Sequence, residues 1–158
     1  AAAWARNVVA NFARPPQGGD TAQIESIAAG ECSVALINHY YWVRMATGTD
    51  AEKAKTARTK LSFPEQDGVG THVNVTAAAV GAHAPNKDNA IRFIEWLATP
   101  EGQKLLTSET KEFPMIAGVP LPEGLDALPD FKQSQFPLQQ LGENQAEAQA
   151  IYDRAGWN

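Results

Sequence analysis

The sequence predicts an α/β protein, and three consecutive features support this fold class. Residues 20–29 carry apolar side chains at helical spacing, and Gly30 directly after them is a typical helix end. The short apolar run at residues 33–37 then predicts a buried strand. A weakly alternating run at residues 72–80 predicts a second strand, and a helical pattern follows it. Helices that alternate with short apolar strands are typical of α/β folds.

Local capping signals predict further helices and one long loop. Thr99 is a suitable N-cap, and Pro100 occupies the first helical position after it. Residues 86–97 begin with polar side chains and then place apolar ones at the spacing of one helix face. The proline-rich stretch at residues 114–129 predicts an extended loop. Further helical segments are expected at residues 1–7, 50–60 and 139–154.

Composition and charge exclude several classes of function. The chain has 158 residues, enough for one sizeable core, and a formal net charge of −5. This charge and the absence of a Lys/Arg cluster argue against nucleic acid as a partner. No apolar run approaches the ~20 residues that span a bilayer. The sequence also lacks a Cys-x-x-Cys pair, a phosphate-binding glycine loop and a nucleophile elbow.

Two adjacent tyrosines, Tyr40 and Tyr41, follow the predicted strand at residues 33–37. Ligands of α/β proteins bind beyond the carboxyl ends of strands, which is where this pair is expected. Phenolate oxygens are hard, anionic donors, and ferric iron is a hard cation strong enough to displace their protons. Neighbouring side chains of a strand point to opposite faces, so both phenols reach one ion only if the chain turns there. A packing role for the two rings remains the alternative.

The chain resembles a known family through motifs spread over most of its length. They lie at residues 12–16 (FARPP), 19–21 (GDT), 28–30 (AAG), 38–42 (NHYYW), 74–78 (NVTAA), 93–97 (FIEWL), 99–103 (TPEGQ) and 152–157 (YDRAGW). On these motifs the chain resembles periplasmic ferric-iron-binding proteins of the iron-deficiency-induced type. Such proteins are the substrate-binding components of bacterial iron ABC transporters.

The resemblance implies a type II periplasmic-binding-protein fold, with two α/β lobes and the metal in the cleft between them. It implies that Tyr40 and Tyr41 ligate Fe(III), which an inner-membrane ABC permease receives from the periplasm. Asn38 matches a residue that lies near a synergistic anion in some members. His39 is expected to be exposed or to support the ligands or the anion. No catalytic residue is expected, because binding and delivery need no chemical step.

The chain is about half as long as members of this family, and it begins as though within a helix. We therefore expect a carboxyl-terminal fragment whose partner is the missing N-terminal half of the same protein. The family pattern predicts that residues 1–70 form lobe two with the tyrosines. Residues 71–121 are expected to return to lobe one through a crossing strand, and residues 122–158 to pack on lobe two.

Two other functions stay open from the sequence. The same fold can carry another cargo, such as an organic solute or an oxyanion. A tyrosinate-iron enzyme is the other possibility, but ring-cleaving oxygenases of that kind need two histidines beside two tyrosines. The three histidines, His39, His72 and His83, show no clustering in the sequence, and none has a partner at the i+4 spacing of helical zinc sites.

Overall fold

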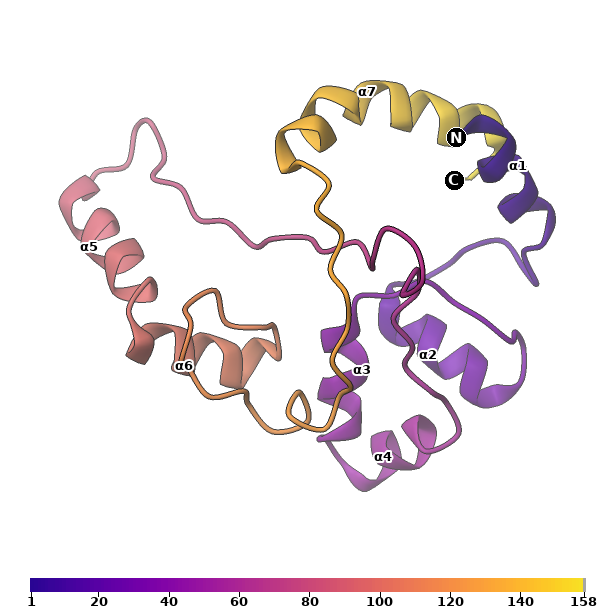
Figure 1. Ribbon diagram of the computed structural model, residues 1–158, viewed down its shortest axis with the longest axis horizontal. Helices are drawn as coiled ribbons and strands as arrows, with labels where there is room; N and C mark the ends of the chain where they lie inside the picture. Colours follow the sequence, from indigo (N-terminus) through magenta and orange to yellow (C-terminus); the bar gives the residue numbers. More distant parts are fainter. Residues whose placement is uncertain (158) are drawn as a thin grey trace. The chain divides into compact units, whose positions relative to one another are not determined.

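The structure is a computed structural model that describes residues 1–157. Its regular elements in this part of the chain are helices, which Figure 1 shows in sequence order. They are α1 (Ala2–Ala10), α2 (Asp20–Ala29), α3 (His39–Ala46), α4 (Asp50–Thr56), α5 (Lys87–Leu97), α6 (Pro100–Thr110) and α7 (Leu138–Ala155). The helices predicted from the sequence are thereby confirmed, and the loop predicted at residues 114–129 contains no helix.

The chain divides into two compact units. Unit 1 comprises Ala1–Leu36, Phe63–His72 and the segment from Phe131 onward, and it contains α1, α2 and α7. Unit 2 comprises Ile37–Ser62 and Val73–Asp130, and it contains α3, α4, α5 and α6.

The helix ends follow from capping chemistry that the sequence encodes. Gly30 ends α2 with a left-handed conformation at φ 82°, which L side chains rarely adopt. Thr99 begins α6 by accepting a hydrogen bond from the Gly102 backbone N–H at 3.1 Å, ahead of Pro100 in the first turn. These local interactions explain why the helix boundaries can be predicted without tertiary information.

Neither predicted strand forms in the described residues, which corrects the expectation for residues 33–37 and 72–80. Both segments are irregular, and the first is not buried, since Val34 is 80 % and Leu36 68 % exposed. A strand exists only when a neighbour satisfies its backbone N–H and C=O groups. The only paired β-bridge in the part of the chain described here joins Thr71 to Gln133 in parallel.

That bridge holds two distant segments of unit 1 together. The Thr71 backbone N–H donates to the Lys132 carbonyl at 2.8 Å, and the Ser134 N–H donates to the Thr71 carbonyl at 2.9 Å. Gly70 makes the approach possible, because a Cβ atom there would lie 2.7 Å from the Gln133 carbonyl carbon. The stacked rings of Phe63 and Phe131, with centroids 4.1 Å apart, pack beside the same two segments.

Unit 1 also joins the beginning and end of the chain through aromatic contacts between α1 and the residues after α7. Trp157 packs edge-on against Phe12, with centroids 5.3 Å apart, and lies 5.0 Å from the Tyr152 ring. Ala5 on α1 and Ile24 on α2 are fully buried. These contacts give unit 1 a core that belongs to residues far apart in sequence.

Unit 2 has a small core beneath α3. Val43 and Met45 on α3 are buried, and Leu125 from the proline-rich loop is 1 % exposed. Gly124 brings that loop onto the helix, because a Cβ atom there would lie 2.8 Å from Val43 Cγ1 and 2.7 Å from Thr47 Cγ2. The Trp42 indole N–H donates to Thr59 Oγ1 at 2.8 Å, which links α3 to the segment after α4. One side of α3 is therefore fixed by packing.

Candidate functional site

The paired tyrosines lie in the first turn of α3 and not at the end of a strand. Asn38 is the N-cap residue, with extended backbone angles of φ −77° and ψ 134°, and the helix begins at His39. The Tyr41 backbone N–H donates to the Asn38 carbonyl at 3.3 Å. The backbone turns at the tyrosine pair, as the expected site requires, but it turns from the extended Asn38 into the first turn of α3.

The two phenol rings lie side by side. The centroids of Tyr40 and Tyr41 are 4.6 Å apart, with an angle of 33° between the ring planes. Both side chains are half-buried, so neither is sealed in an apolar interior. The pair can therefore offer two phenolate oxygens in one region of the molecule.

His39 lies beside this pair in a half-buried position, so the exposed alternative predicted for it is wrong. Its ring lies 4.9 Å from the Phe113 ring and makes an edge contact with Tyr40 at 5.7 Å. Its Nε2 atom is buried without a hydrogen-bond partner among the described residues. Burial lowers the pKa of the imidazole below 6.5, against the opposing effects of a hydrogen bond with the Lys111 backbone and the charge of Glu112. Burial thus favours the neutral form of the imidazole next to Tyr40.

Arg44 is part of the same cluster, and the sequence reasoning missed it. Its guanidinium carbon lies 4.6 Å from the Tyr41 ring centroid and 5.2 Å from that of Tyr40. Residues three and four apart share one face of a helix, and this spacing relates Arg44 to both tyrosines. The spacing rule identifies the residue only once the helix at His39–Ala46 is known.

Asn38 contributes its backbone to the first turn of α3, whereas its side chain makes no capping hydrogen bond. The residue is exposed, and its side chain leaves the helix start without the usual side-chain cap.

Other metal-binding side chains do not gather elsewhere in the described residues. Residues 1–157 contain no group of three or more His, Cys, Asp or Glu side chains suited to hold an ion. His72 and His83 are both exposed.

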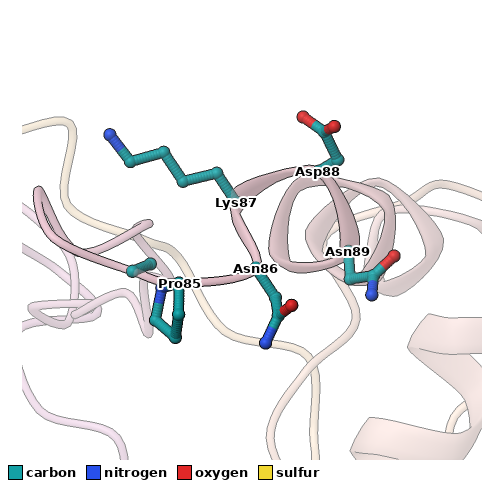
Figure 2. Close-up of a pocket in the computed structure, with 6 residues that line it drawn as sticks. Pro85, Asn86, Lys87, Asp88 and Asn89 are labelled. Atoms are coloured by element: carbon teal, nitrogen blue, oxygen red, sulfur yellow. The ribbon is translucent and has the colours of Figure 1, made fainter.

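Two open hollows of the surface are lined by residues other than the tyrosines. The one at the start of α5 has a volume of about 410 Å³ and is lined by residues 84–89. Figure 2 shows that the side chains of Lys87 and Asn89 point in different directions there and do not converge. The other hollow includes Arg14, whose guanidinium already donates to Ser26 Oγ at 2.7 Å and pairs with Glu31 at 3.4 Å. Neither hollow resembles a preformed binding site.

Comparison with known proteins places the chain in a family. Residues 1–133 match the family described as bacterial extracellular solute-binding protein. The chain belongs to this family. The chain is 43 % identical over 156 residues to iron uptake protein A1 of Synechocystis sp., and this match covers 98 % of the chain and 43 % of the relative.

Solved structures extend the match to the fold. The chain is 40 % identical to the Trichodesmium protein IdiA (FutA), solved in complex with iron and citrate, and superposes with a TM-score of 0.91. It is 35 % identical to the ferric binding protein of Campylobacter jejuni, with a TM-score of 0.94. Each match covers 99 % of this chain and 50 % of the solved chain. The predicted fold class and the resemblance to ferric-iron-binding proteins are thereby confirmed, and the chain has the architecture of half of a type II periplasmic binding protein.

The chain spans about half the length of the relatives that it matches. Each helix in the described part of the chain falls short of the length or the apolarity that a membrane span requires.

Proposed function

We propose that this chain contributes the tyrosine ligands of a ferric-iron site in a periplasmic transport protein. The observation that carries the proposal is the side-by-side arrangement of Tyr40 and Tyr41, with ring centroids 4.6 Å apart. It occurs in a chain whose relatives include an iron uptake protein and ferric-binding proteins. Two phenolates offset two of the three charges of Fe(III), and both are hard donors suited to a hard ion.

Two phenolates leave most of an octahedral shell to other donors. We propose that an anion and residues of the longer protein fill it, since the Trichodesmium relative was solved with both iron and citrate. Asn38 and His39 flank the pair and are proposed to support the ligands or the anion. His39 suits a supporting role because its Nε2 atom is buried without a partner in the described chain.

We propose that the bound ion passes to an inner-membrane ABC permease without any chemical step. In this scheme residues 1–70 form lobe two, residues 71–121 return to lobe one, and residues 122–158 pack on lobe two. The missing N-terminal half closes over the iron, as hinge closure around ligand is usual for periplasmic binding proteins. The fragment alone is expected to bind iron weakly.

The experiment is a ferric titration of the chain followed by the visible tyrosinate-to-iron charge-transfer band. Wild type is expected to show the band, Tyr40→Phe and Tyr41→Phe to weaken it, and the double variant to lack both band and iron binding. Tyr152→Phe is the matched control, because Tyr152 packs against Trp157 in unit 1 and is expected to leave the band unchanged. Iron binding that is equal in wild type and the double variant would overturn the assignment and favour another cargo.

A further inference from the structure

Adjacent residues on a helix do not normally bring their side chains together. Successive side chains are rotated by about 100° around the helix axis. The rings of Tyr40 and Tyr41 nevertheless lie with centroids 4.6 Å apart, in the first turn of α3. Helix ends are the part of a helix that frays most readily. A contact that spans both rings stabilises their shared orientation.

Arg44 supplies such a contact. Its guanidinium lies 4.6 Å from one ring centroid and 5.2 Å from the other, within the range of a cation–π interaction. Arg44 is four residues after Tyr40 and three after Tyr41, so the next turn of the helix presents it to both. A planar guanidinium stacks on aromatic faces and is always charged, which suits it to hold two rings at once.

The Arg44 guanidinium forms no salt bridge in the part of the chain that the structure describes. Arg44 is exposed, and the ion pair recorded among these residues joins Arg14 to Glu31. No carboxylate of residues 1–157 competes with the two rings for the guanidinium. The neighbouring residues Val43 and Met45 are buried and anchor α3 on either side of Arg44, so the base of the Arg44 side chain is held in place.

We propose that Arg44 is a positioning residue that holds both phenols together so that they bind one ion as a pair. The inference rests on the proposed function for its purpose, but the orientation of the rings is a separate, metal-free property.

The test combines one metal-free and one metal-bound measurement on the chain. Arg44→Met removes the charge and keeps an unbranched stem, whereas Arg44→Lys keeps a cation. Arg92→Met is the matched control, because Arg92 is an exposed arginine on α5 in the same unit. Cross-peaks between the Tyr40 and Tyr41 rings in NMR spectra report their distance without metal. Charge-transfer absorbance per bound iron reports how many tyrosines ligate, with Tyr41→Phe as the single-tyrosine reference.

We expect Arg44→Met to lose the inter-ring cross-peaks and to fall to about half the wild-type absorbance per iron, near the Tyr41→Phe value. Arg44→Lys is expected to retain most of both signals, and Arg92→Met all of them. Wild-type cross-peaks and absorbance in Arg44→Met would overturn the inference. If the wild-type chain shows no charge-transfer band with iron, the ferric site is refuted. The metal-free cross-peaks between the Tyr40 and Tyr41 rings then test the role of Arg44 by themselves. Should Arg44→Met lose its helical circular dichroism signal, Arg44→Gln takes its place.

Discussion

His39 packs against Phe113 with the two ring centroids 4.9 Å apart, at the start of the helix that carries the tyrosines. This contact buries one face of the imidazole and leaves Nε2 without a hydrogen-bond partner in residues 1–157. The cost of burying a charged ring explains why the pKa of His39 is lowered. Folded unit 2 therefore favours the neutral form of the His39 imidazole.

The lowered pKa predicts a pH-dependent stability. The unfolded chain takes up the His39 proton near pH 6.5, whereas the folded chain does so only at lower pH. The unfolded state thus binds more protons in this interval, and the free energy of unfolding falls as the pH drops through it. Above pH 6.5 the contribution of His39 to stability is fully present.

Urea denaturation of the metal-free chain at pH values on either side of 6.5 measures this dependence. His39→Phe is expected to reduce it. His72→Gln, a change at an exposed histidine, is expected to keep it. An unchanged pH dependence in His39→Phe contradicts the prediction.

Thr49 and Glu52 cap the start of α4 reciprocally, so Thr49→Ala is expected to destabilise the chain. The Glu52 backbone N–H donates to Thr49 Oγ1, and the Thr49 N–H donates to the Glu52 carboxylate at 2.8 Å. Loss of such an N-cap hydroxyl typically costs about 1 kcal/mol. Thr49→Ser retains the hydroxyl and should stay close to wild type in thermal unfolding followed by circular dichroism. Equal losses in both variants would show that the methyl group, and not the cap, matters.

Gly124→Ala is expected to loosen the loop that packs on α3. Gly124 has φ +90°, and a Cβ atom there would lie within 2.8 Å of Val43 Cγ1, which is fully buried. Left-handed strain alone costs about 1–3 kcal/mol for a residue other than glycine. Gly142→Ala is a control that is expected to have the opposite effect on stability, because Gly142 lies inside α7 with open space around it. Alanine there should stabilise the helix by about 0.5–1 kcal/mol. Denaturation midpoints that move in the same direction for both variants would refute this account.

Gln103 joins α6 to two other segments of unit 2, and its removal is expected to be costly. It is 8 % exposed, donates to the Leu97 carbonyl at 2.9 Å, and accepts from the Met115 N–H at 2.8 Å. A buried polar group left without a partner costs about 1–3 kcal/mol. Gln103→Leu is predicted to lose stability by this order, measured by urea denaturation. Gln103→Glu keeps the acceptor for the Met115 N–H, so its stability should lie between those of wild type and Gln103→Leu. A Gln103→Leu variant as stable as wild type would disprove the prediction.

The helices could be predicted because their signals are local. Gly30 and the Thr99–Pro100 pair act on residues within one turn, so the sequence contains all the information that sets these ends. The predicted strands are different, because a strand depends on a partner that can lie anywhere in the protein. Residues 33–37 have the apolar composition of a strand, yet no segment among residues 1–157 pairs with them.

The same difference between local and distant interactions decides what could be predicted of the candidate site. The tyrosine pair was found from residue chemistry, but the helix that carries it was expected to be a strand end. Once α3 is known, Arg44 follows from helical spacing. The contact between His39 and Phe113 could not be predicted, since it joins residues far apart in the sequence through the packing of unit 2.

The Thr71–Gln133 bridge has a consequence for how the chain tolerates insertions and deletions. The chain leaves unit 1 after His72 and re-enters it at Phe131, so the bridge closes a long excursion. The entropy of closing a flexible loop grows only logarithmically, by about 0.6 kcal/mol for each doubling of length. Insertions or deletions within the excursion therefore have little effect on the bridge itself. An insertion within residues 73–130 can therefore leave the point where the chain departs from unit 1 and returns to it unchanged.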